Sequence, residues 1–365
     1  MERGITMLKT LSERTNDYNA NYFMNELFEA SKLLGILEAK ISEYQFNSIL
    51  IPMFQNKEAI SSMTIEGTQT TMTDVLEDRI NLNKNQEQKD AAILEYRNHT
   101  KALIYGSEYL SGNIFTDNFL FELHKIMMTG LLSDKNHKCI GQYKTVDNFI
   151  ANSAGTIVFA PPSHLETPKY MRELLGYMND MSDNVNPLIK AAIIHSQFES
   201  IHPFEDGNGR VGRLLVSLYL YKSKVINFPF FYISEAINQD KAVYYQKLTN
   251  SRNSTYDEWI RFFLQKCTVQ AQNLINYIDA LNSLYKRTKK QVKESINSPK
   301  FEKIIECIFT QPIVTAKYLA QQLSVTDGQA RRYLETLEKI NVLFGDDRKR
   351  GRKYYFVEML DLARR

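Results

Sequence analysis

Hydrophobic residues recur at steps of three and four along much of the chain, which is the spacing of an amphipathic helix. The stretch 23–43 shows this pattern clearly, with apolar residues at Phe23, Leu27, Ala30, Leu34, Leu37 and Ile41. The same spacing predicts further helices at 57–66, 88–110, 117–131, 167–181, 187–200, 210–223, 239–250 and 257–264. Gly67 follows the first of these further segments, at a position where glycine commonly ends a helix. The pattern therefore predicts a mainly α-helical protein.

One internal stretch, 141–162, departs from the helical pattern. It contains two glycines and two prolines, and between them lies the β-branched and aromatic run Thr156, Ile157, Val158 and Phe159. A run of this kind, bounded by turn residues, is typical of a strand in a short hairpin. We therefore expect a β-hairpin flap on an otherwise helical molecule.

The basic stretch at 286–290 is expected to belong to a connecting helix. Beyond Pro299 the pattern becomes that of a small separate unit. It predicts helices at 301–309, 316–323 and 327–340, followed by strands at 342–344 and 353–357. Three helices followed by a two-stranded wing make a winged helix-turn-helix domain. We expect three parts, namely an N-terminal helical region at 1–85, a core at 86–285 and a winged helix domain at 296–365.

Composition places the chain among ordinary globular proteins, with 43% hydrophobic and 24% charged residues in 365. The net charge of +3 argues against a chain that coats nucleic acid along its whole length. The three cysteines lie far apart and suggest neither a disulfide framework nor a metal motif. No apolar run reaches the roughly 18 residues that span a bilayer, and the N-terminus lacks the features of a signal peptide. These features predict a cytoplasmic protein without membrane contact.

The densest group of chemically useful side chains lies at His202–Arg213. Apolar residues recur at helical spacing after Gly209, so Gly207, Asn208 and Gly209 should form a turn at the start of a helix. The first turn of a helix has free N–H groups and the positive end of the helix dipole, and glycines let a ligand approach the backbone. This turn is therefore expected to bind phosphate.

The side chains around this turn complete a site for nucleotidyl transfer. Arg210 and Arg213 can each hold phosphate oxygens through paired hydrogen bonds. Asp206 offers an oxygen ligand to a Mg²⁺ ion that bridges phosphates. A neutral imidazole at His202 can take the proton of an attacking hydroxyl. Positioned phosphates, neutralised charge and an activated nucleophile are what such a reaction needs.

Two other interpretations of this segment are weaker. Gly207, Gly209 and Gly212 also spell the dinucleotide-binding fingerprint, but that motif should follow directly on an apolar strand. Here residues 203–206 intervene, and the run before them predicts a helix. A polar loop without any ligand would leave the arginines, the aspartate and the histidine together without explanation.

The segment resembles the signature of the Fic family, which is HPF, two residues, and then GNGRxxR. Every fixed position matches, and the resemblance covers roughly residues 20–265. Residues 197–201, which lead into the motif, and residues 141–143, which precede the flap, also match the family. The resemblance implies an all-helical fold with a hairpin flap. It also implies transfer of AMP from ATP to a serine, threonine or tyrosine of a protein.

The resemblance assigns a role to each residue of the motif. His202 is the general base, and Asp206 binds Mg²⁺, or Mn²⁺ in its place. Gly207, Asn208 and Gly209 form the anion hole for the triphosphate. Arg210 and Arg213 hold its β- and γ-phosphates. ATP is therefore the expected substrate, and a divalent cation the expected cofactor.

Further positions outside the motif also match the family. Tyr244 and Tyr245 match a tyrosine pair near the adenosine of relatives, although the sequence alone favours a place in the core for them. A target protein would add an extended segment to the edge of the flap strand at Thr156–Phe159. Lys144 departs from the family pattern, in which an arginine is common at this position. The difference concerns local contacts of the flap. No catalytic role is assigned to the remaining histidines.

A second segment, near the N-terminus, resembles an inhibitory motif that some Fic proteins carry, [ST]xxxE[GN]. It consists of Ser62, Glu66 and Gly67, and the first two share a helix face. In those proteins the glutamate pairs with the second arginine, here Arg213, and blocks productive binding of the γ-phosphate. We hypothesise that Glu66 restrains AMP transfer, and that it also orients water to remove AMP from modified targets. In an unknown protein the same residues would simply end a surface helix.

Several alternatives remain open for the function and its partners. The core could act as a nucleotide sensor in a DNA-binding regulator, but a sensor does not need the intact His202. The transferred group could be phosphate, another nucleotide or phosphocholine, although the small glycines favour AMP. The acceptor is a hydroxyl of a target protein or of the chain itself.

The C-terminal unit has a basic excess that makes DNA a candidate partner. Arg331 and Arg332 lie on the expected recognition helix, and residues 348–353 place further positive charges in the wing. Protein contacts, including a homodimer, are an equal alternative for this unit.

Overall fold

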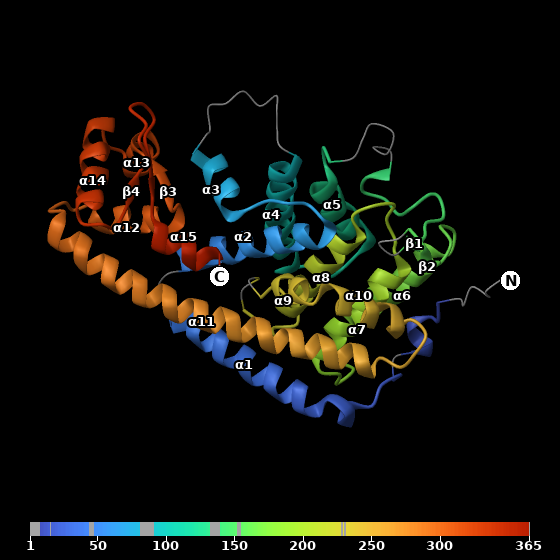
Figure 1. Ribbon diagram of the computed structural model, residues 1–365. Coiled ribbons are helices and arrows are strands. Elements are labelled where there is room, and N and C mark those ends of the chain that lie inside the picture. The colour runs from blue at the N-terminus through green and yellow to red at the C-terminus, as the bar shows by residue number, and fades with distance from the viewer. Residues whose placement is uncertain are drawn as a thin grey trace.

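The computed structural model describes residues 8–14, 16–43, 47–80, 91–131, 139–151, 155–227, 229 and 231–364. Helices dominate these residues, as the hydrophobic spacing predicted, and the strands form only two small sheets (Figure 1). None of the helices in the described part of the chain is long and apolar enough to cross a membrane.

The longest helix, α11 (Asp257–Ser295), joins the core to the C-terminal unit (Figure 1). Helix α1 (Met24–Glu43) lies along it and buries the face that carries Leu34 and Leu37. Two short 3-10 helices, η1 (Leu11–Glu13) and η2 (Ala20–Phe23), precede α1. The prediction for 23–43 is confirmed, whereas 257–264 proved to be only the first part of a helix that continues across both units.

Helix α2 (Asn47–Glu66) carries the inhibitory segment at its C-terminal end. It begins ten residues before the predicted 57–66, because Pro52, which argues against a helix interior, is accommodated inside it. Gly67 ends the helix with φ of +97°, and the N–H of Thr68 closes the turn on the carbonyl of Met63 at 3.0 Å. Helix α3 (Met72–Ile80) follows directly.

The core is built around the consecutive helices α7 (Pro187–Ile201) and α8 (Asn208–Lys222), which pack on each other. Almost every residue of α7 is buried, and Trp259 of α11 donates a hydrogen bond to the carbonyl of Ala192 at 2.7 Å. The other core helices are α4 (Ala91–Leu110), α5 (Asp117–Met128), α6 (Thr167–Asn179), α9 (Ser234–Gln239) and α10 (Lys241–Ser251). The predicted helix 239–250 is interrupted at Asp240, which separates α9 from α10.

The predicted hairpin is present. Strands β1 (Ile150–Ala151) and β2 (Ile157–Phe159) pair antiparallel, with Ile150 opposite Phe159. The turn residues 152–154, including the Asn152 region of the expected flap, lie outside the described residues. The flap lies beside α10 at one end of the core (Figure 1).

The C-terminal unit contains the three helices and two strands that the sequence predicted. These are α12 (Phe301–Thr310), α13 (Ala316–Leu323), α14 (Asp327–Lys339), β4 (Phe344–Gly345) and β5 (Lys353–Tyr355). The structure adds β3 (Ile313–Thr315), which pairs with β5, and α15 (Val357–Arg364). The sequence missed β3 because three residues are too few to show a pattern. It also placed Val357 in the last strand, whereas Val357 begins α15.

The C-terminal unit packs directly against α2 and α3. The side chain of Gln311 donates to the carbonyl of Leu76 at 2.6 Å, and Lys353 pairs with Glu77 at 2.8 Å. The unit therefore contacts the helix that follows the inhibitory segment.

Candidate active site

The loop between α7 and α8 holds the motif in a fixed shape. His202 caps α7 in the left-handed conformation (φ 50°, ψ 59°), and Gly207 caps the start of α8 with φ of 80°. The Asn208 side chain accepts from the N–H of Phe204 and donates to its carbonyl, both at 2.8 Å. The expected turn at a helix start is therefore present, and Asn208, Gly209 and Arg210 form the first turn of α8.

A pocket of about 890 Å³ opens beside this turn. Such a volume is in the range of small-molecule sites in proteins. The side chains around it come from α2, the flap, α7, α8 and α10, and include Glu66, Val158, Glu199, His202, Gly209, Arg213, Tyr244, Tyr245 and Arg252. Of the residues that the sequence placed in one site, Glu66, His202, Gly209 and Arg213 line this cavity although they come from separate segments. The neighbouring motif residues Asp206, Gly207, Asn208 and Arg210 are not part of its lining.

Glu66 and Arg213 form the ion pair that the inhibitory motif implied. Arg213 is 1% exposed, and its Nη2 lies 2.7 Å from Glu66 Oε1. Its Nε donates to the Ser62 hydroxyl at 3.1 Å and its Nη2 to the Ser62 carbonyl at 3.0 Å. Burial alone would raise the pKa of Glu66, but the Arg213 charge outweighs it and lowers that pKa. The carboxylate therefore remains ionised beside the turn.

Gly209 brings the Glu66 carboxylate against the backbone of the turn. A Cβ added at Gly209 would lie 2.4 Å from Glu66 Oε1, which no real contact allows. A glycine is therefore required at this position for Glu66 to approach. The same close approach is available to a phosphate when the carboxylate is displaced.

Arg210 is also paired with carboxylates. Its Nη1 lies 2.9 Å from Glu95 Oε1 and its Nη2 3.2 Å from Asp206 Oδ1. The other oxygen of Glu95 accepts from the Thr68 hydroxyl at 2.9 Å, so Glu95 joins Arg210 to the end of the inhibitory helix. Glu95 was not predicted, because it is one of 42 acidic residues and lies 115 positions from Arg210.

Lys144, at which the sequence departs from the family pattern, contacts the segment that leads into the flap and the end of α7 before His202. Its Nζ donates to Asn148 Oδ1 at 2.8 Å and to the carbonyl of Ile201 at 3.3 Å. Asn148 in turn donates to the carbonyls of His202 (3.2 Å) and Phe204 (2.9 Å). The lysine thus keeps a positive charge beneath the imidazole.

Burial lowers the pKa of His202 to about 4, and the charge of Lys144 adds to this effect. The folded-state pKa therefore lies below the ordinary value of 6.5, and the imidazole stays neutral down to about pH 5. A neutral ring is the form that can accept a proton.

We expect histidine NMR of the free protein to show His202 titrating with a midpoint near 4, assigned by the signal that is lost in His202→Ala. Because unfolding restores the higher pKa, His202 also stabilises the fold less as the pH falls below 6.5. A midpoint at 6.5 would contradict the burial argument.

Tyr244 and Tyr245 differ in their surroundings. The Tyr244 hydroxyl lies 2.9 Å from His195 Nε2 and its ring is 1% exposed, so it belongs to the core as well as to the pocket wall. Tyr245 is 43% exposed and offers its ring to the cavity. A place in the core therefore holds for Tyr244, whereas contact of the pair with the adenosine stays a prediction.

Two polar residues of the pocket wall were missed in the sequence. Glu199 and Arg252 are each 6% exposed, and neither Glu199 Oε1 nor Arg252 Nη1 has a hydrogen-bond partner among the described residues. Burial raises the pKa of Glu199 to about 7. Glu199 lies three residues before His202 and could have been noticed from that position, but Arg252 has no signal of its own in the sequence.

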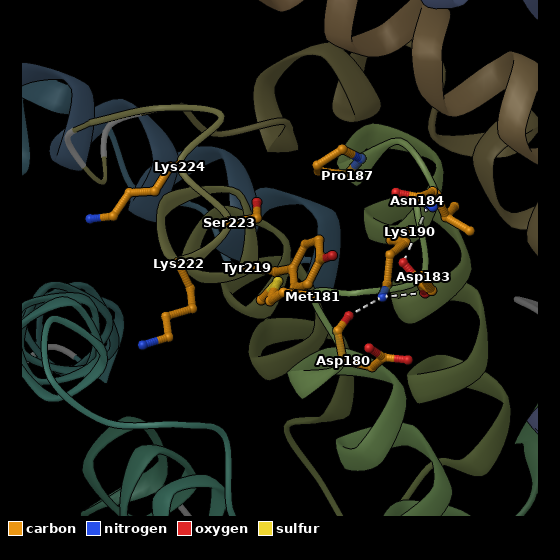
Figure 2. A pocket seen from close by; sticks show the side chains of 11 residues that line it. Asp180, Met181, Asp183, Asn184, Pro187, Lys190, Tyr219, Lys222, Ser223 and Lys224 are labelled. Atoms are coloured by element: carbon orange, nitrogen blue, oxygen red, sulfur yellow. Dashed lines mark hydrogen bonds and ion pairs between the residues drawn. The ribbon is translucent and has the colours of Figure 1, made fainter.

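A second pocket, of about 320 Å³, lies at the other end of α8 (Figure 2). Lys190 reaches from α7 to the carbonyl of Asp180 and to the carboxylate of Asp183, whereas Lys222 and Lys224 point away from the Tyr219 ring. The buried charges of this pocket are thus already paired with each other. Among the described residues, its lining includes neither a histidine nor an arginine, in contrast to the site at the motif.

Only one carboxylate of the motif is placed to meet a cation. The Asp206 side chain is 52% exposed and directly precedes the phosphate turn. The described residues contain no group of three or more potential metal ligands. Mg²⁺ is commonly held by one or two carboxylates together with substrate phosphates. The site therefore suits a cation that arrives with a nucleotide.

Comparison with known proteins identifies the family. The model of the Fic/DOC family matches residues 114–220, and that of the Fic/DOC family N-terminal region matches residues 24–108. Together these matches cover more than half of the chain, which belongs to the Fic/DOC family.

Curated relatives share parts of this chain. A probable protein adenylyltransferase of Aquifex aeolicus is 30% identical over 167 residues, which are 44% of this chain and 47% of that protein. Protein adenylyltransferase fic-1 of Caenorhabditis elegans is 36% identical over 66 residues, 18% of this chain and 13% of that protein. The matched segment thus spans about half or less of the length of these relatives.

Solved structures share the fold over a greater length. A Fic family protein of Desulfovibrio desulfuricans has a TM-score of 0.60 at 20% identity, covering 93% of this chain and 97% of that chain. A Fic domain containing signaling protein of Bacteroides thetaiotaomicron has a TM-score of 0.55 at 21% identity, covering 68% and 97%. These likenesses establish the mainly helical Fic fold.

Proposed function

We propose that this chain is a protein adenylyltransferase, which moves AMP from ATP to a serine, threonine or tyrosine hydroxyl of a target protein or of the chain itself. The observation that carries the proposal is the pocket in which His202 and the Glu66–Arg213 pair meet the first turn of α8. The Aquifex and Caenorhabditis relatives, which are named as protein adenylyltransferases, support it.

In this proposal the motif residues divide the work of one displacement. The first turn of α8, Arg210 and Arg213 hold the β- and γ-phosphates. Asp206 would hold Mg²⁺, or Mn²⁺, which neutralises phosphate charge when bound. His202 takes the proton of the acceptor hydroxyl, whose oxygen forms a bond to the α-phosphorus. The bond from that phosphorus to the bridging oxygen breaks, and pyrophosphate leaves.

The flap is proposed as the docking edge for the target. Ile157 is 59% exposed and Val158 lines the pocket, so one strand offers both an outer edge and a contact with the site. An extended target segment would add a strand at Thr156–Phe159 and bring its hydroxyl to His202.

A labelling experiment tests the proposal. Protein from the Glu66→Gly variant is incubated with ATP that is radiolabelled either at the α- or at the γ-phosphate. We expect label on protein from the α-phosphate alone, because the γ-phosphate leaves with pyrophosphate. Label from the γ-phosphate would indicate phosphorylation instead and would overturn the assignment.

Two finer points belong to the same proposal. The Glu66 carboxylate faces the pocket, where it can orient water against an AMP-modified hydroxyl, so wild-type protein incubated with a modified target should release AMP. Release of no AMP under any metal condition would contradict the role of Glu66 in AMP removal.

The three cysteines are free, which fits a reducing cytoplasm.

We keep the proposed division of the chain into three parts, at 1–85, 86–285 and 296–365. DNA is proposed as a partner of the last of these, the C-terminal unit. Arg331 and Arg332 are exposed on α14, and so are residues 348–350 of the wing. Helix α14 lies at the end of the molecule far from the flap (Figure 1). Arg348 pairs with Asp346 but its side chain is 60% exposed. Arg352 and Lys353 pair with Glu338 and Glu77, are less exposed, and are not counted in this surface.

We expect a gel shift with duplex DNA that weakens when residues 348–350 are replaced by alanine. The slope of log affinity against log salt should fall by about 1 for each phosphate contact removed. A control removes the same charge from exposed lysines of other helices, namely Lys32, Lys101 and Lys125. Equal weakening by both triple variants, or no shift at all, would contradict a specific DNA surface.

A further inference from the structure

A buried histidine, His124 of α5, clamps the loop that carries Asp206. The His124 ring is 1% exposed and stacks on the Phe204 ring, with centroids 3.9 Å apart and planes inclined by 1°. The backbone N–H of Gly141 lies 3.0 Å from its Nδ1, and the carbonyl of Asp206 lies 3.0 Å from its Nε2. The ring thus makes three contacts, two of them with the motif loop.

These contacts fix which nitrogen carries the proton. Because the Gly141 N–H can only donate, Nδ1 must be the acceptor and carries no proton. A neutral imidazole then has its proton on Nε2, and Nε2–H donates to the Asp206 carbonyl. Both nitrogens are satisfied in this arrangement, so neither has to be reached by water.

The carboxylate of Asp206 has few contacts outside its own loop. Its side chain is 52% exposed, and Oδ1 accepts from the partly buried N–H of the neighbouring Gly207 at 2.6 Å and, at the surface, from Arg210 at 3.2 Å. Both partners belong to the same loop and helix start, and the exposed ion pair with Arg210 contributes little. The buried anchor of this residue is its backbone carbonyl, which His124 holds.

We propose that His124 is a positioning residue for Asp206, which sets the carboxylate where it meets the cation that accompanies a bound triphosphate. The inference rests on the proposed function, because it takes Asp206 as the ligand of that cation. His124 touches neither the acceptor nor the reacting phosphorus, and it acts only through the loop.

Three substitutions separate the contacts of His124. His124→Phe keeps a ring to stack on Phe204 but loses both hydrogen bonds. His124→Asn keeps an acceptor near the position of Nδ1 and has no group at Nε2. His124→Gln can place an amide N–H near the position of Nε2, so it retains a donor for Asp206.

The test measures ATP affinity by calorimetry, with Mg²⁺ and with EDTA, in the Glu66→Gly background. The quantity of interest is the gain in affinity that Mg²⁺ provides. We expect His124→Phe and His124→Asn to reduce this gain about fivefold, the effect of one hydrogen bond. Metal-free affinity should stay within about twofold of the parent, because the turn itself is unchanged. His124→Gln should recover most of the gain.

Each other outcome would overturn the inference. An unchanged Mg²⁺ gain in His124→Phe and His124→Asn would show that Asp206 needs no clamp. An equal fall in metal-free affinity would show that His124 merely supports the whole loop. In both cases the parent would still bind ATP and transfer AMP, so the proposed function would stand. Absence of any Mg²⁺ gain in the parent would instead remove the assignment of Asp206, and this inference with it.

Discussion

Replacing Glu66 with glycine should raise the rate of AMP incorporation by roughly 10- to 100-fold, the range expected when a contact of about 1.4–3 kcal/mol no longer has to be displaced. In the structure, Glu66 Oε1 lies 2.7 Å from Nη2 of the buried Arg213, in the pocket beside the first turn of α8. A triphosphate that needs Arg213 must displace this carboxylate. Intact-mass spectrometry after incubation with ATP and Mg²⁺ measures the change.

The same substitution should also lower stability when no nucleotide is present. Arg213 would keep its bonds to Ser62 but lose the only carboxylate that pairs with it among the described residues. Leaving a buried charge without its partner costs about 3 kcal/mol or more. We expect ATP to restore the loss in a thermal unfolding experiment. The Glu66→Gln variant, which keeps the size of the side chain, should be intermediate between wild type and Glu66→Gly both in stability and in the rate of AMP incorporation. Equal incorporation by all three proteins would show that Glu66 does not restrain the reaction.

Adding His202→Ala to Glu66→Gly should reduce AMP transfer by about 100- to 10,000-fold, the range for loss of a positioned general base. His202 lines the pocket in a left-handed cap conformation, and its lowered pKa keeps it ready to accept a proton. ATP affinity should change little, because the turn and both arginines remain. Calorimetric ATP binding therefore serves as the control for folding. A double variant that transferred AMP as fast as Glu66→Gly would assign the base elsewhere.

Much of the fold was predictable because its signals are local. The helical spacing of α1 and α6 and the turn residues around the hairpin lie within single segments. The start of α2 was not predictable, because Pro52 argues against a helix and only the packing of that helix on α4 and α9 overrides it. Helix α11 includes both 257–264 and the connecting helix expected at 286–290. That the two are one helix was missed, because its second half is polar on one side and gains partners from α12 and α15.

The site follows the same division between local and distant contacts. His202–Arg213 could be interpreted as a unit because its residues are contiguous and their spacing has a chemical meaning. Glu66 lies 147 positions from Arg213, and only its likeness to a known motif connected the two. Glu95 and His124 contact the same loop from α4 and α5 without any such motif. Their roles depend on how distant helices pack, which hydrophobic spacing does not specify.

The crystal structure of the Glu66→Gly variant with a non-hydrolysable ATP analogue and Mg²⁺ is the most direct test of how this chain holds its nucleotide. The expected result places the β- and γ-phosphates on the first turn of α8, with Arg213 turned to the γ-phosphate, Asp206 on the cation and the α-phosphorus facing His202. A triphosphate bound elsewhere, with that turn covered by packing, would contradict the proposed reaction.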